Sequence, residues 1–146
     1  MITTRQAHDT LRAIVDEVGA DYKYDPPIGT SCFYTVRDTQ AEARQTLGSD
    51  RAGPVFQHAW GVLMSGEPVG PGCLIGQMMH RLGVDLATLA LCDSKGAIQE
   101  VARRGLVDFE DERLEFALAG AQSVQDKGGT WGEALTVFEH ALAVPS

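Results

Sequence analysis

The stretch PGCLIGQMMHRLGVDLATLAL, residues 71–91, decides the fold, because it carries the most regular pattern in the chain. Its apolar residues recur at helical steps and share one face: Leu74, Ile75, Met78, Met79 and Leu82. Gly83 ends this helix, since glycine accepts the left-handed conformation found after a helix. Asp85 then caps a second, short helix by accepting a bond from a free backbone N–H. The stretch predicts two helices joined by a tight turn.

Length and charge set the broad class. A chain of 146 residues with 44% hydrophobic residues predicts a single domain, residues 1–146. The net charge of −8 opposes binding to nucleic acid and to anionic membranes. No apolar run approaches the ~18 residues of a membrane span, and the first residues lack a signal-peptide pattern, so we expect an acidic cytoplasmic protein. Cys32, Cys73 and Cys92 are too few and too far apart to predict a disulfide framework.

The remaining segments predict a mainly α fold (α+β) with five to six helices and a small two-stranded β element. Amphipathic patterns with capping residues mark helices at residues 3–18, 95–104, 108–127 and 130–145, with a short one at 39–48. The last two form a C-terminal antiparallel helical hairpin around Gly128-Gly129. The runs CFYTV, residues 32–36, and VFQHAWGVLM, residues 55–64, favour strands because Val, Phe and Trp populate them. SGEPVGPG, residues 65–72, predicts a linker, and Asp93 or Ser94 is the expected cap of the helix at 95–104.

The central stretch also has the spacing of a helix–turn–helix DNA-binding motif. Counted from Ile75, its hydrophobic residues fall at the core positions of that motif and Gly83 falls at the turn. The second helix offers only Thr88 to base edges, and the densest basic spot in the chain is Arg103-Arg104. Groove recognition needs base-reading and phosphate-neutralising side chains, so two packed helices without DNA contact are the favoured interpretation.

Cys73 is the leading candidate for reactive chemistry. It opens the central helix, and a helix N-terminus lowers the pKa of a thiol. His80 lies about 10 Å further along the helix axis, too far for direct contact, so a catalytic base would have to be His58, brought in from elsewhere. The favoured alternative is that Cys73 and Cys92 are small core residues. Metal-ligand spacings and the common phosphate and dinucleotide motifs are absent, so no metal and no cofactor are expected.

The turn before the last helix is a third candidate site. Gln125, Asp126 and Trp131 cluster around it. Loops on rigid helices often carry function, and tryptophan is favoured in interface hot spots, so these residues predict a partner-binding patch. A structural interpretation is favoured over this one: glycines end one helix, a capping box starts the next, and Trp131 packs inside.

Two stretches resemble a family of small uncharacterised proteins from actinobacteria and their bacteriophages: PGCLIGQMMHRLGV, residues 71–84, and QDKGGTWGEAL, residues 125–135. In that family a Cys-x-x-Gly helix start precedes an Asp-x-x-Gly-x-Thr/Trp segment that opens the last helix. The matching positions here are Cys73 and Gly76, then Asp126, Gly129, Trp131 and Leu135. The aromatic–cysteine segment from Tyr24 to Tyr34 is similar too, whereas residues 38–64 look like an insertion. The resemblance implies a compact helical fold and an actinobacterial or phage setting, with no implied activity.

These patterns lead to three hypotheses about function. The first is a non-enzymatic accessory protein that binds a protein partner in the cytoplasm, or in the host cytoplasm for a phage-encoded chain. The second is a helix–turn–helix DNA-binding regulator, and the third is a Cys-dependent enzyme. An enzyme is the less favoured class because the sequence shows no catalytic constellation. The partner and the oligomeric state are left open.

Overall fold

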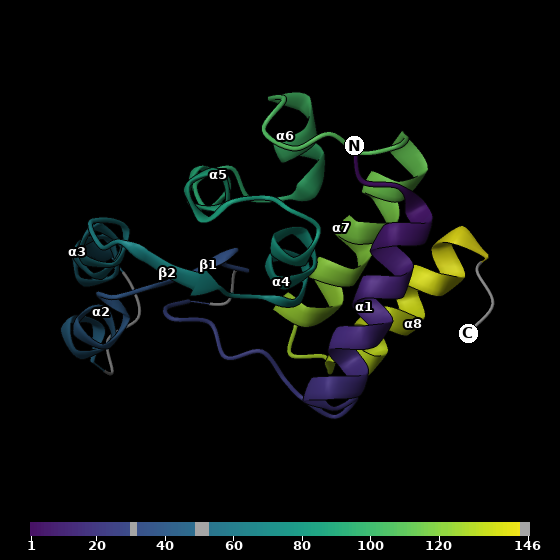
Figure 1. Ribbon diagram of the computed structural model, residues 1–146. Helices are drawn as coiled ribbons and strands as arrows, with labels where there is room; N and C mark the ends of the chain where they lie inside the picture. The colour runs from purple at the N-terminus through teal and green to yellow at the C-terminus, as the bar shows by residue number, and fades with distance from the viewer. Residues whose placement is uncertain (30–31, 49–52, 144–146) are drawn as a thin grey trace.

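The computed structural model describes residues 1–29, 32–48 and 53–143 (Figure 1). Within them lie eight α-helices and one two-stranded antiparallel sheet, which confirms the mainly α prediction, although five to six helices was too few. In chain order the elements are α1 (Thr4–Val18), β1 (Thr35–Arg37), α2 (Gln40–Leu47), α3 (Gly53–Met64), β2 (Pro68–Pro71), α4 (Leu74–Arg81), α5 (Leu86–Cys92), α6 (Ile98–Arg103), α7 (Glu112–Asp126) and α8 (Trp131–Leu142). None of these described helices is both long enough and apolar enough to cross a membrane.

The main core lies between α1, α4, α7 and α8 (Figure 1). α4 supplies its centre, because Leu74, Ile75, Met78 and Met79 are all buried, as the pattern of residues 71–91 predicts. α7 and α8 lie side by side and run in opposite directions, joined by a short turn. A buried contact between His8 and Glu139, 2.7 Å long, joins α1 to α8.

Local capping signals place the ends of several helices correctly. The capping boxes of Thr3 with Gln6 and Thr130 with Glu133 are both formed. Asp85 accepts the backbone N–H of Thr88 at the start of α5. Gly83 has a φ of 102°, the positive value that favours glycine after a helix.

The predicted strand at residues 55–64 is wrong, because this run forms α3. Val55, Ala59 and Leu63 recur every four residues and lie on one face of that helix. α3 packs on α2, and together they enclose a second apolar cluster of Ile28, Phe33, Ala43, Leu47, Ala59 and Leu63. Packing of an amphipathic face therefore outweighs the β propensity of Val, Phe and Trp.

The strand that pairs with β1 is β2, which lies within the predicted linker at 65–72. β1 itself begins at Thr35, later than the predicted strand at 32–36. Val36 lies opposite Gly70 and Arg37 opposite Pro68, with an irregularity in the register between Val36 and Arg37. Prolines are tolerated here because both strands are edges, where a missing N–H need not break a ladder.

The start of α4 packs directly on the backbone that leads into β1. A Cβ added at Gly72 would collide with the carbonyl of Phe33, and one added at Gly76 would collide with the carbonyl of Tyr34. Glycine at these positions is required by that close approach. Phe33 belongs to the second cluster and Tyr34 to the main core, so consecutive residues bind the two clusters together.

A buried ion pair joins β1 to α5. Arg37 donates to Asp93 over 3.0 Å, and both side chains are almost fully buried. Asp93 also accepts the backbone N–H of Tyr34 at 2.6 Å and the hydroxyl of Thr35. The same guanidinium donates to the carbonyls of Gly66 and Ala90. Asp93 is thus committed to this network.

The helix expected at 95–104 accordingly has a different cap from the predicted Asp93 or Ser94. α6 begins only at Ile98, whose N–H donates to Gln122 Oε1 of α7 at 3.1 Å. The cap comes from a residue distant in sequence, which local spacing does not reveal.

We expect Arg37→Met to lower the free energy of unfolding by roughly 3–5 kcal/mol, because it leaves the Asp93 carboxylate buried and unpaired. Arg81→Met is the matched control. Arg81 pairs with Glu17 at the surface, where such pairs contribute about 0–1 kcal/mol. Urea unfolding followed by circular dichroism measures both. Equal losses in the two variants would contradict a structural role for the buried pair.

Candidate functional site

The two segments that carry the family resemblance meet at the start of α4. Gln125 Oε1, near the end of α7, accepts the backbone N–H of Leu74 at 3.1 Å. The same oxygen accepts the indole N–H of Trp131 at 2.9 Å. The end of α7 therefore caps α4 from a position distant in sequence. We call this contact the motif junction, defined by Cys73, Leu74, Gln125, Asp126 and Trp131.

A disulfide joins Cys32 to Cys73 at this junction, with Cα atoms 5.9 Å apart. It corrects the expectation of unpaired cysteines, and its cause is the extension of the β1–β2 ladder. Beyond the sheet, Gly72 N donates to Tyr34 O and Cys73 N donates to Phe33 O, each at 2.9 Å. That pairing carries Cys32 alongside Cys73 across a sequence separation of 41 residues, which spacing alone does not predict.

Asp126 lies beside the disulfide. Asp126 and Cys32 both line one cavity of about 410 Å³. Burial raises the pKa of Asp126. Among the described residues, Asp126 Oδ1 and Gln125 Nε2 are buried without a hydrogen-bond partner. Polar atoms left in this way are costly and mark candidate sites.

A second cavity of about 640 Å³ also has Asp126 in its lining. It is bounded by Tyr24 to Gly29, the end of α2, and Gln125 to Gly128. Arg44 crosses between its walls, donating to the carbonyls of Pro26 and Pro27 and to Asp25. This cavity therefore lies where α2 packs against residues 25–27, and Arg44 bonds the two together.

The predicted partner-binding patch does not lie on the surface as a unit. Trp131 is 1% exposed and Gln125 is 3% exposed, because both face the motif junction. The ring of Trp131 packs edge-on against Tyr22, with centroids 4.6 Å apart. Of the three residues, Asp126 alone is partly exposed. The structural interpretation of this turn accounts for Trp131 and Gln125.

The predicted pair of Cys73 and His58 is not formed. Cys73 is fully buried in the main core and bonded to Cys32. His58 lies on the exposed face of α3, which packs on α2 in the second cluster. An amphipathic helix turns that side chain to solvent, so it supplies no base to the thiol. Cys92 is buried and unpaired, as expected for a core cysteine.

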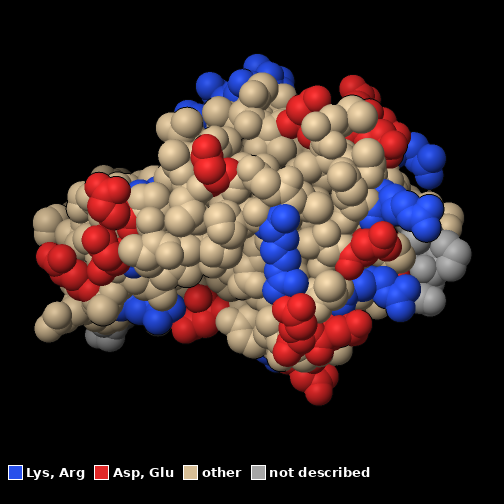
Figure 2. All heavy atoms as spheres, in the orientation of Figure 1, with Lys and Arg blue, Asp and Glu red and all other residues tan. Residues whose placement is uncertain are grey.

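The candidate DNA-binding residues are not arranged for groove contact. Thr88 is half-buried beside Asp85 and Asp108 in a hollow at the N-terminus. Arg103 and Arg104 both bind Glu100 of their own helix, at 2.6 and 2.8 Å. On the face in Figure 2, basic side chains lie among acidic ones. Phosphate binding needs a basic face that is not already neutralised.

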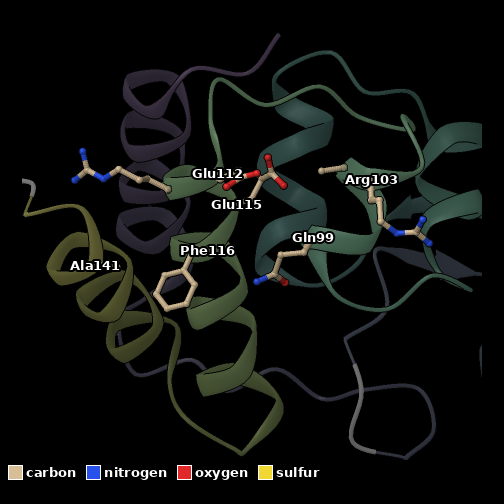
Figure 3. A pocket seen from close by; sticks show the side chains of 8 residues that line it. Gln99, Arg103, Glu112, Glu115, Phe116 and Ala141 are labelled. Atoms are coloured by element: carbon tan, nitrogen blue, oxygen red, sulfur yellow. The ribbon is translucent and has the colours of Figure 1, made fainter.

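A groove lies between α6, α7 and α8, around Phe116 (Figure 3). Its volume is about 720 Å³ and it is lined by Gln99, Ala102, Arg103, Glu112, Arg113, Glu115, Phe116 and Ala141. The ring of Phe116 projects from α7 beside α8 and is 68% exposed. Sequence reasoning missed this site, although a signal was present. Phe116 comes two residues after the buried Leu114, which places it on the opposite face of the helix.

Comparisons with models of protein families, with curated proteins and with solved structures found no match. The resemblance to the actinobacterial and phage family therefore stays a prediction.

We expect reduction of the Cys32–Cys73 disulfide to lower the free energy of unfolding by roughly 2–4 kcal/mol, because the bond restricts the unfolded chain. Thermal melts with and without a phosphine reductant measure the change. The double variant Cys32→Ala, Cys73→Ala is the control and should melt at the same temperature in both conditions. The same melting temperature for the wild type with and without the reductant would contradict the expectation.

We expect Asp126→Asn to change the pH dependence of stability. The folded protein holds a proton on Asp126 more tightly than the unfolded chain does. That contribution is complete below the unfolded pKa and is lost as pH rises through the folded pKa. Without the carboxyl group the loss disappears, so the variant should gain stability relative to wild type as pH rises.

Urea unfolding at a series of pH values from about 4 to 7.5 measures this difference. Asp9→Asn, at an exposed position of α1, is the control. Parallel curves for Asp126→Asn and wild type would show that the buried carboxyl group has no such effect.

Proposed function

We propose that the chain is a non-enzymatic accessory protein that binds a protein partner through the groove around Phe116. The observation that carries this proposal is the exposure of a phenylalanine ring, at 68%, in the middle of a three-helix groove. Burying such a side chain is worth about 1.5–3 kcal/mol. Most of this side chain stays exposed in the fold, so binding is the process that would recover much of this free energy.

The surroundings of Phe116 have the composition of a protein interface. Ala102 of α6 and Ala141 of α8 are small and leave room beside the ring for an apolar side chain. Arg113, Glu112 and Glu115 line the groove around this apolar centre with both signs of charge, and Arg103 lines it while paired with Glu100. An aromatic centre with a polar rim rich in arginine is typical of binding hot spots.

This chemistry defines the kind of partner. A groove between helices with an apolar centre suits an amphipathic helix that inserts one large apolar side chain. Charges of both signs on the rim favour a partner segment that carries both as well. The net charge of −8 argues against nucleic acid and anionic membranes as occupants. We therefore propose an amphipathic helix of another protein as the ligand.

The test begins with a photo-crosslinking amino acid at position 116, compared with the same group at position 69. Val69 is the matched control because it is 58% exposed on β2, away from the groove. In the cells that encode the chain, the proposal expects one protein to be crosslinked from position 116 and not from 69. Equal labelling from both positions would contradict it.

Binding of the purified crosslinked protein then gives the energetic test. We expect Phe116→Ser to weaken binding by about tenfold or more, equivalent to about 1.4 kcal/mol, since the ring is the proposed anchor. Val69→Ser should bind as wild type does, and Phe116→Leu should recover part of the affinity. Equal affinity of Phe116→Ser and wild type would overturn the proposal. Circular dichroism confirms that the exposed substitutions leave the fold unchanged.

A further inference from the structure

We propose that the Cys32–Cys73 disulfide is a thiol–disulfide exchange site for a low-molecular-weight thiol, which enters the cavity next to Cys32 and attacks the sulfur of Cys32. This inference is independent of the Phe116 groove. It rests on the different accessibility of the two sulfurs, on the helix start that holds Cys73, and on the buried polar groups beside them.

Access distinguishes the two cysteines. Cys73 is fully buried, whereas Cys32 is 9% exposed and lines the cavity of about 410 Å³. That volume lies within the range of about 300–1,000 Å³ typical of small-molecule sites. The cavity therefore gives an incoming thiol an approach to Cys32, the less buried of the two cysteines. Lys127 lines the same cavity and favours a thiol that carries a carboxylate.

The position of Cys73 makes it a good leaving group. Cys73 is the N-cap of α4, and no side chain caps that helix start in its place. Gln125 occupies the N–H of Leu74, while the described residues provide no acceptor for the N–H groups of Ile75 and Gly76. Free N–H groups at a helix N-terminus stabilise a thiolate, and a more stable thiolate leaves faster.

Asp126 is placed to accept the proton of the incoming thiol. It shares the cavity with Cys32, and its Oδ1 has no hydrogen-bond partner among the described residues. Beside it, Gln125 is 3% exposed and keeps an unpartnered Nε2. A carboxylate of raised pKa is a stronger base than an ordinary aspartate, and a neutral thiol avoids the repulsion that a thiolate would meet.

The exchange balances in two steps. First, the thiol R–SH loses its proton to Asp126 as its sulfur attacks Cys32; the R–S–S–Cys32 bond forms, the Cys32–Cys73 bond breaks, and Cys73 leaves as a thiolate. Asp126 then releases its proton and the Cys73 thiolate takes one up. Second, another R–SH attacks the sulfur that belongs to R in the mixed disulfide, which releases R–S–S–R and the Cys32 thiolate, and the proton of this second thiol passes to Cys32. The net reaction reduces one protein disulfide to two thiols and oxidises two small thiols to one disulfide.

Reduction by glutathione under native conditions tests the proposal. A Cys92→Ala background removes the third thiol, which is buried and has its pKa raised to about 11. Free thiols are then counted over time with a chromogenic disulfide. The proposal expects a rate that is independent of low urea concentrations, because the folded protein reacts. A rate that rises steeply with urea, in step with global unfolding, would overturn it.

Single-cysteine variants assign the attacked sulfur. With Cys73→Ala in the same background, Cys32 should form a mixed disulfide with oxidised glutathione, detected by mass spectrometry. With Cys32→Ala, Cys73 should react more slowly than Cys32 does, by about tenfold or more, because it is buried. Equal rates would overturn the assignment. Where an alanine variant loses its fold, iodoacetamide labelling of the partly reduced wild type, followed by peptide mapping, answers the same question.

The pH profile tests Asp126 itself. We expect Asp126→Asn to slow reduction by glutathione about tenfold at pH 7 and to match wild type above the thiol pKa of about 8.5, where no base is needed. Ser123→Ala, in the same cavity, is the matched control and should leave the profile unchanged. A uniform change across all pH values, or none at pH 7, would overturn the role given to Asp126.

Discussion

The ion pair between Arg37 and Asp93 is the constraint on which the rest of the structure depends. A single guanidinium holds the end of β1, the turn before β2 and the end of α5. The carboxylate of Asp93 accepts the backbone N–H of Tyr34 and the hydroxyl of Thr35, which precede Arg37 in the chain. Two buried charges are costly on their own, and the cost is offset only because every part of this network is bonded. The arrangement fixes where the chain enters and leaves the main core.

Much of the helical part of the fold could be predicted from local signals. The apolar face of residues 74–82, the capping box at Thr3 and the glycine at 83 all act within one or two helical turns, so their spacing in the sequence is their spacing in space. Residues 55–64 show where this fails. Their aromatic and β-branched residues favour a strand locally, but the face formed by Val55, Ala59 and Leu63 has a partner in α2, which only the folded chain reveals.

The candidate sites were harder to predict, because they depend on residues distant in sequence. The sequence points to Cys73 and to Asp126 as parts of two different candidate sites. No spacing in the sequence indicates that Cys32 lies near both of them. The pairing of residues 33–34 with 72–73 places it there. Trp131 had a functional and a structural interpretation, and its bond to Gln125 inside the fold favours the structural one. Phe116 was predictable in principle, since its position opposes the buried face of α7.

The pairing of Arg37 with Pro68 has a consequence for how this fold can vary. The chain leaves the sheet at Arg37 and returns at Pro68, which faces it. The segment that contains α2 and α3 is therefore connected to the rest of the fold at two neighbouring points. A short reverse turn would span the same gap, since facing strand residues lie about 5 Å apart. We therefore expect that α2 and α3 can be shortened, lengthened or exchanged without changing the connections of the main bundle, and that their removal would expose Ile28 and Phe33.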